Sequence, residues 1–189
     1  TDGGVFALFT SYAALRRVGG ALRESGVDGR WPLFVQGEVD RHRLLDRFVR
    51  SGRGVLLGTS SFWEGVDVPG DPLRGLLIQT LPFRVPTEPI TAARREAGQR
   101  PGLDPFQHFM LPHAALRLKQ GFGRLIRSRA DRGAVLMLDD RILRKRYGRY
   151  LRESLPDAPL VKGAWTDVRR RIRDFYDGSP ALGGPRGPS

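Results

Sequence analysis

The residues best suited to chemistry lie in Gln120–Arg127, which reads Q-x-x-G-R-x-x-R. Arg124 and Arg127 are three positions apart, so on a helix they share one face, and Gln120 lies one turn before Arg124. Two glycines in the same stretch leave room for a ligand close to the backbone. Each guanidinium offers a planar fork of charged donors, so the pattern predicts a phosphate-binding site. For an R-x-x-R pair taken alone, a solvated basic helix remains the alternative.

A second group of candidates follows the apolar run Gly54–Gly58, which we expect to be a buried strand. Ligands of open parallel sheets bind beyond the carboxyl ends of the strands, where the hydroxyls of Thr59 and Ser60 would lie. Glu64 and Asp67 come next, three positions apart. Asp67 could accept a hydrogen bond from a ribose hydroxyl or simply cap a turn.

Two aromatic residues, Phe62 and Trp63, lie inside this second group. Aromatic rings can stack on the bases of a single strand, at about 1–3 kcal/mol per base. Packing of these rings into the core is the more common alternative.

The elements that must position these candidates alternate along the first sixty residues. Strands are expected at Val5–Phe9, Pro32–Gln36 and Gly54–Gly58, with a helix after each of the first two. Thr10 or Ser11 would cap the first helix. The second helix would span Asp40–Arg50, and its inward side chains would be Leu44, Leu45, Phe48 and Val49. This alternation predicts an α/β fold, with an open, mainly parallel sheet and helices on both faces.

The remaining elements continue this pattern after one interruption. Five prolines precede Pro112 in the stretch 82–112, which we expect to be an insertion that leaves the sheet. Further strands are expected within Leu73–Leu81, Gly133–Leu138 and Leu160–Val161. Further helices are expected over about 112–127, from Ile142 to Leu155, and over Thr166–Asp177. In the last of these, Val168, Ile172 and Phe175 would point inward. Residues 1–177 would form the domain, and 178–189, rich in glycine and proline, a disordered tail.

Composition narrows the class of protein. The net charge is +12 and the pI is near 11.2, which favours a polyanionic partner. No cysteine is present, which excludes disulfides and thiolate metal sites within this chain and fits a cytoplasmic location. No run of eighteen apolar residues indicates a membrane span, and the three histidines show no metal-binding spacing. We therefore expect no metal site here.

Three motifs in order resemble motifs IV, V and VI of superfamily-two helicases, in the DinG/XPD-like branch. They are Leu8–Tyr12, then Glu64–Gly70, then Gln120–Arg127 running into Ser128–Gly133. The proline-rich stretch, with Leu81-Pro82-Phe83 and Leu111-Pro112, resembles the DinG pattern between motifs V and VI. The similarity covers roughly residues 5–156.

The resemblance implies a second RecA-like motor domain, which completes an ATP site when it closes on an N-terminal RecA-like domain. Arg127 is expected to be the arginine finger on the γ-phosphate, with Arg124 beside it and Gln120 sensing nucleotide. Such a finger is typically worth about 10³–10⁵ in rate.

The other two motifs imply the remaining contacts. The motif V residues expected at the ATP site, linking nucleotide state to the DNA track, are Glu64, Gly65 and Asp67. The residues expected to bind phosphates of single-stranded DNA are Thr10, Ser11, Thr59 and Ser60.

The chain departs from a complete helicase in two respects. It has no G-x-x-x-x-G-K-[ST] loop and no Asp-Glu box, and the nearest acidic pair, Asp139-Asp140, ends a later strand. The resemblance implies that ATP and Mg²⁺ are bound mainly by a missing N-terminal half. In this branch that half often carries a cysteine-held iron–sulfur cluster, and some relatives instead join the motor to a nuclease domain. The chain alone is expected to be an inactive, monomeric fragment.

Two alternatives from other functional classes remain. A standalone nucleic-acid-binding module would use the same basic surface without hydrolysis. An interaction module would dock an acidic protein on the arginine-rich helix Arg141–Arg152.

Overall fold

The computed structural model describes residues 1–59, 62, 73–83, 104, 106–126 and 131–178. The chain divides into two compact units, residues 2–156 and residues 157–189 with Thr1. Each unit is described separately below.

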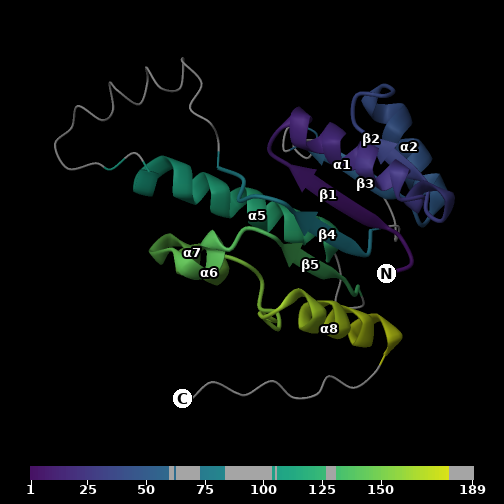
Figure 1. Cartoon of the computed structure of the whole chain (residues 1–189). Helices are drawn as coiled ribbons and strands as arrows, with labels where there is room; N and C mark the ends of the chain where they lie inside the picture. The colour runs from purple at the N-terminus through teal and green to yellow at the C-terminus, as the bar shows by residue number, and fades with distance from the viewer. Residues whose placement is uncertain (60–61, 63–72, 84–103, 105, 127–130, 179–189) are drawn as a thin grey trace. The chain divides into compact units, whose positions relative to one another are not determined.

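The larger unit is built on a five-stranded sheet in the order β2-β3-β1-β4-β5 (Figure 1). Every neighbouring pair in it is parallel. The strands are β1 (Val5–Phe9), β2 (Leu33–Val35), β3 (Val55–Thr59), β4 (Gly75–Ile78) and β5 (Ala134–Met137). All five lie where the apolar runs predicted them, and the expected α/β fold with a parallel sheet is confirmed.

Helices cover both faces of the sheet, which explains why its strands are almost continuously apolar. Alternate residues of β1 point to opposite faces, so Phe6 enters one core cluster and Ala7 and Phe9 enter another. The cluster around Ala7 includes Leu15 of α1 (Tyr12–Glu24).

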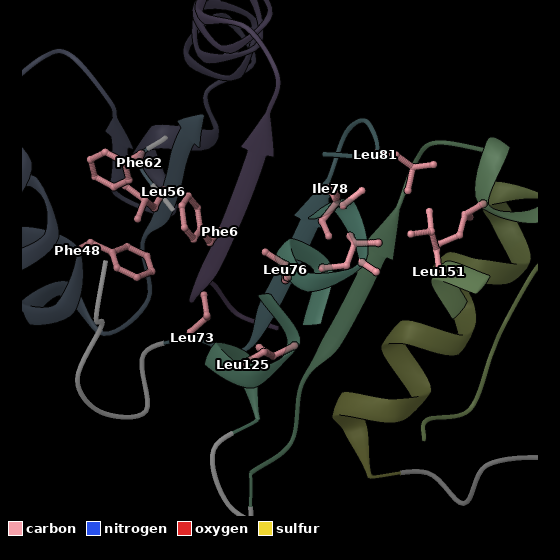
Figure 2. Packing of buried hydrophobic residues seen from close by; sticks show 14 of the residues in the cluster. Phe6, Phe48, Leu56, Phe62, Leu73, Leu76, Ile78, Leu81, Leu125 and Leu151 are labelled. Atoms are coloured by element: carbon pink, nitrogen blue, oxygen red, sulfur yellow. The ribbon is translucent and has the colours of Figure 1, made fainter. Parts of the chain in front are cut away.

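The larger cluster lies on the other face and joins the strands to α2 (Arg41–Ser51) and α5 (Leu111–Leu125). Figure 2 shows this packing, with Phe48 of α2 beside Leu56 and Phe6, and Leu76 beyond them. Along α5 the buried residues recur at helical spacing: Leu111, Ala114, Ala115, Leu118, Gly121 and Leu125. This stripe packs α5 against the sheet, so the opposite face of the helix points away from the sheet.

Local signals define the ends of the first two helices. The Ser11 hydroxyl accepts a hydrogen bond from the backbone N–H of Ala14 at 3.2 Å and caps α1, as one of the two predicted residues. The Asp40 carboxylate caps α2 through the N–H of Arg43 at 3.1 Å.

The connections place helices on opposite faces after two adjacent strands. β1 and β4 are neighbours; β1 leads into α1 on one face, and the chain after β4 continues to α5 on the other. The carboxyl ends of β1 and β4 therefore flank a topological switch point, the usual ligand site of open α/β sheets.

The helix expected from Ile142 to Leu155 is two helices, α6 (Arg141–Arg144) and α7 (Arg146–Glu153). Lys145 between them is extended, with φ −90° and ψ 147°. At Gly148 a Cβ atom would lie 2.3 Å from the Ile142 carbonyl oxygen, so only glycine permits this close return of α7 onto α6.

Helical backbone begins before Pro112, because a π-helical turn, Phe106–Met110, runs directly into α5. Phe106 packs against Phe83 and Tyr147, with ring centroids 5.5 and 5.1 Å away, and Phe83 lies 5.5 Å from Tyr147. These three rings form an aromatic cluster at the two ends of the proline-rich stretch, most of which lies outside the described residues.

The smaller unit contains α8 (Trp165–Asp177), close to the predicted helix. Within α8, Val168 and Ile172 are half-buried and Phe175 is exposed, so the inward placement expected for these three residues stays a prediction. The predicted strand at Leu160–Val161 is wrong: both residues are exposed and neither is in a strand. A run of two apolar residues is shorter than the strands that usually form sheets in globular proteins.

Candidate functional site

Polar side chains gather where the parallel strands end, at what is called here the carboxyl edge of the sheet. They follow or end each strand in turn: Thr10 and Ser11 (β1), Gln36 (β2), Thr59 (β3), Gln79 and Thr80 (β4), and Asp139 (β5). Of the predicted DNA-binding residues, the structure brings Thr10, Ser11 and Thr59 to this edge. Ser60 lies outside the described residues.

A hydrogen-bond network occupies the edge beyond β2 and β3. The Gln36 side-chain oxygen accepts from the backbone N–H of Thr59 at 2.7 Å and from its hydroxyl at 3.0 Å. The Gln36 amide donates to the Tyr12 hydroxyl at 2.6 Å. Thr59 is only 5% exposed, so its hydroxyl proton is directed to Gln36 inside the protein. Sequence reasoning missed Gln36 because no motif surrounds it.

Ser11 and Thr10 are both exposed. Because the Ser11 oxygen accepts its capping hydrogen bond, the hydroxyl proton can still be donated outward, at the positive end of a 13-residue helix. Backbone N–H groups at such an end favour anions.

A small cavity lies at the topological switch point between β1 and β4. Its lining combines the end of β1, the segment after β4 and one face of α5: Leu8, Phe9, Thr10, Ile78, Thr80, Pro82, Arg117, Leu118 and Gly121. Arg117 is the cation in this lining, and burial lowers the pKa of its guanidinium. Two hydroxyls, Thr10 and Thr80, complete the polar part.

The predicted phosphate-binding helix is α5, and it carries Gln120 and Arg124 in its last two turns. Gln120 is exposed and Arg124 is half-buried. Arg117 precedes Arg124 by seven residues, so both lie on one face of α5. The helix ends at Leu125, and Ile126 is extended.

Several predicted site residues cannot be placed. Arg127, the expected arginine finger, lies outside the described residues, and so do the three motif V candidates, Glu64, Gly65 and Asp67. The two aromatic candidates have different outcomes. Trp63 is outside the described residues. Phe62 is buried in the core, and the centroid of its ring lies 6.3 Å from that of Phe6. Core packing is therefore the correct interpretation for Phe62.

Asp139 is a buried carboxylate that the sequence showed only as part of an acidic pair. It accepts from the backbone N–H of Leu81 at 2.9 Å and from that of Arg141 at 3.1 Å. The Arg141 guanidinium also contacts it, at 2.6 Å from the terminal nitrogen. Burial alone would raise the pKa of Asp139, but the hydrogen bonds from Arg141 and Leu81 outweigh it, and the pKa is lowered.

The described part of the chain offers neither a metal-binding cluster nor a membrane-spanning helix. No group of three or more His, Cys, Asp or Glu residues there could hold a metal ion. None of the helices described is long and apolar enough to cross a membrane.

Comparison with known proteins decides the family. Residues 1–158 match the helicase C-terminal domain family. The chain belongs to this family. This match and the DinG and YoaA relatives described next confirm the motif-based resemblance to DinG-like helicases, and α5 is the helix that contains the predicted motif VI residues Gln120 and Arg124.

Three relatives are named DNA helicases or nucleases. The ATP-dependent DNA helicase YoaA of Escherichia coli is 41% identical over 172 residues, covering 91% of this chain and 26% of the relative. The ATP-dependent DNA helicase DinG of Photobacterium profundum is 43% identical, covering 79% and 22%. The 3'-5' exonuclease DinG of Bacillus subtilis is 41% identical, covering 80% and 16%. This helicase domain thus spans about a quarter of the length of the first two.

Among solved structures, the Escherichia coli DEAD-box protein SrmB, bound to the regulator of ribonuclease activity A, aligns with 86% of this chain and 84% of its own. The TM-score is 0.47 and the sequence identity 14%.

Proposed function

We propose that this chain is the second motor domain of an ATP-dependent DNA helicase, with residues 1–177 forming the domain. The observation that carries the proposal is the family match over residues 1–158, with the predicted motif VI residues Gln120 and Arg124 on α5, a helix that packs across one face of the sheet. Polar groups from several strands meet at the carboxyl edge of the sheet, where open α/β sheets bind ligands.

On the DNA side, Ser11 and Thr10 contact phosphates of a single strand. Ser11 supplies a hydroxyl at the amino end of α1, and Thr10 is exposed beside it. Ser60 adds a third hydroxyl, and Thr59 acts mainly through its bonds to Gln36, which fix the end of β3. Phosphate contacts carry no sequence information, so binding is expected to be sequence-independent and strongly salt-dependent.

On the nucleotide side, the partner is an N-terminal RecA-like domain that supplies the phosphate loop and the Mg²⁺-binding carboxylates. Arg127 stabilises the charge that develops on the transferred γ-phosphoryl group, Arg124 supports it, and Gln120 contacts the nucleotide. Glu64, Gly65 and Asp67 link nucleotide state to the DNA strand. Because the sequence given holds neither a phosphate loop nor an Asp-Glu box, it does not hydrolyse ATP alone.

The test compares two arginine variants in the full-length protein that contains this chain. Arg127→Ala should lower DNA-stimulated ATP turnover by about 10³-fold or more, while single-strand affinity falls only a few-fold. Arg50→Ala is the matched control, because Arg50 is an exposed arginine in the last turn of α2, outside all three motifs, where it pairs with exposed Asp46. Turnover by Arg127→Ala within a few-fold of the control would contradict the finger assignment.

A further inference from the structure

Two side chains of the segment between β2 and α2 hold the chain that leaves β3. Gln36, directly after β2, accepts from the backbone N–H and the hydroxyl of Thr59. Arg41, the first residue of α2, donates from its guanidinium to the backbone carbonyl of Phe62 at 2.9 Å. Thr59 ends β3, and Phe62 lies two residues before the predicted motif V. One short segment, outside all three motifs, therefore holds both ends of this connection.

The contact between Arg41 and Phe62 controls the direction of the backbone more than the packing of the core. Phe62 is 4% exposed, and its ring packs with Phe6 in the larger core cluster, beside Leu56 in Figure 2. Burial of the ring already fixes the position of the residue. A hydrogen bond to its carbonyl fixes instead the plane of the peptide that follows. Arg41 thus sets the direction in which the chain leaves Phe62.

Arg41 occupies a position that helix stability alone disfavours. A cation at the amino end of a helix lies at the positive end of the helix dipole, and the first turn of α2 contains no acidic residue. The capping carboxylate of Asp40 offsets part of this cost. The guanidinium also lies 5.3 Å from the centroid of the Phe62 ring, within the range of a cation–π contact. Residues that contradict a local preference are expected at functional sites.

We propose that Arg41 is a positioning residue for motif V. Its hydrogen bond fixes the direction in which the chain leaves Phe62 toward Glu64, Gly65 and Asp67. The proposal rests on the proposed function, in which these three residues link nucleotide state to the DNA strand. Loss of the bond then weakens that link without removing a group that contacts DNA or ATP. The resulting protein still binds single-stranded DNA but no longer converts this binding into faster ATP turnover.

The test uses the full-length protein that contains this chain. Arg41→Met removes the donors and keeps most of the aliphatic packing. Arg41→Lys keeps a cation that can donate to the carbonyl of Phe62. Arg47→Met is the matched control, because Arg47 is an exposed arginine of the same helix. ATP turnover is measured without DNA and over a range of oligo(dT) concentrations. Thermal melting checks that each variant folds, and Arg41→Gln replaces Arg41→Met if the latter is unfolded at the assay temperature.

Arg41→Met should lower the stimulation of ATP turnover by DNA about ten-fold or more, since a small misplacement caused far from the reaction can cost up to about 100-fold. Turnover without DNA, and the oligo(dT) concentration for half-maximal stimulation, should each stay within about three-fold of wild type. Arg41→Lys should recover most of the stimulation, and Arg47→Met should match wild type.

Two outcomes of this assay would overturn the proposal. One is equal stimulation of Arg41→Met and Arg47→Met by DNA. The other is a rise of about ten-fold in the half-maximal oligo(dT) concentration of Arg41→Met with unchanged maximal turnover, because Arg41 would then bind the strand itself.

A second measurement separates failure of this proposal from failure of the proposed function. Hydrogen–deuterium exchange of the same full-length proteins reports on the backbone directly after Phe62. Faster exchange there in Arg41→Met than in Arg47→Met would support positioning by Arg41, and equal exchange would overturn it. If the wild-type protein showed no DNA-stimulated turnover, the proposed function would fail, and exchange alone would decide the role of Arg41.

Discussion

The backbone N–H of Leu81 donates a hydrogen bond to the Asp139 carboxylate at 2.9 Å, although the two residues are 58 positions apart. This bond ties the start of the proline-rich stretch to the segment after β5. Arg141 holds the same carboxylate and places its guanidinium 5.9 Å from the centre of the Phe83 ring. Asp139 thereby joins the segment after β4 to the segment after β5.

Replacing Asp139 should destabilise the domain. Asp139→Ala leaves the buried N–H of Leu81 without its acceptor and removes the partner of Arg141, at an expected cost of about 2 kcal/mol. Asp140→Ala is the matched control, since Asp140 is an exposed carboxylate paired with Arg144 and should cost at most about 0.5 kcal/mol. Urea unfolding of both variants measures the difference, and equal losses would show that the Asp139 contacts do not stabilise the fold.

The same carboxylate gives a pH dependence of defined sign. Its pKa in the folded state is lowered, below the unfolded value of about 3.9. Its contribution to the free energy of unfolding is therefore fully present above about pH 5 and is lost as the pH falls through the folded pKa. Asp139→Asn should lose less stability than wild type between pH 5 and pH 2.5. Parallel pH profiles for the two proteins would contradict this assignment.

Ser11 can be tested so that capping and phosphate binding separate. Aspartate and asparagine both cap helices as well as serine, so neither variant should lower the melting temperature by more than a few degrees. Ser11→Asp places a negative charge where the phosphate is proposed and should weaken oligo(dT) binding at least ten-fold. Ser11→Asn is the neutral control and should stay within about three-fold of wild type. Similar affinities for the two variants would remove Ser11 from the strand track.

Gln36 should matter for stability although no motif marks it. Gln36→Ala leaves both the N–H and the hydroxyl of buried Thr59 without their acceptor, at an expected cost of about 1–2 kcal/mol in urea unfolding. Gln36→Glu keeps an acceptor for Thr59 and should cost less. The control is Glu38→Ala, which breaks an exposed pair with Arg23 and should cost at most about 0.5 kcal/mol. A Gln36→Ala loss no larger than the control would show the network to be dispensable.

The sequence predicted the sheet well because each strand of a doubly covered parallel sheet must be apolar throughout, and such runs stand out between turns. It predicted the cap of α1, with Ser11 as one of two candidates, because that signal is local. It could not predict that Lys145 would separate α6 from α7, since an extended lysine follows from tertiary packing around Gly148 and not from its own preference.

The same distinction between local patterns and long-range contacts applies to the candidate site. The sequence correctly predicted that Gln120 and Arg124 lie on a helix, because both belong to one contiguous motif. The bonds of Gln36 to Thr59 and of Asp139 to Leu81 join residues 23 and 58 positions apart, and no spacing in the sequence announces them. Arg117 was missed for a similar reason, since only the fold brings it beside Thr10 and Thr80.

The aromatic cluster of Phe83, Phe106 and Tyr147 fixes the separation between the two ends of the intervening segment, which leaves the cluster at Phe83 and returns to it at Phe106. With both ends held by α7 and α5, the entropic cost of closing that segment depends only weakly on its length, by about 0.6 kcal/mol for each doubling. The domain can therefore accept exchange of this segment for a longer or shorter one without altering the sheet. Relatives could diversify at this position while the motor core stays the same.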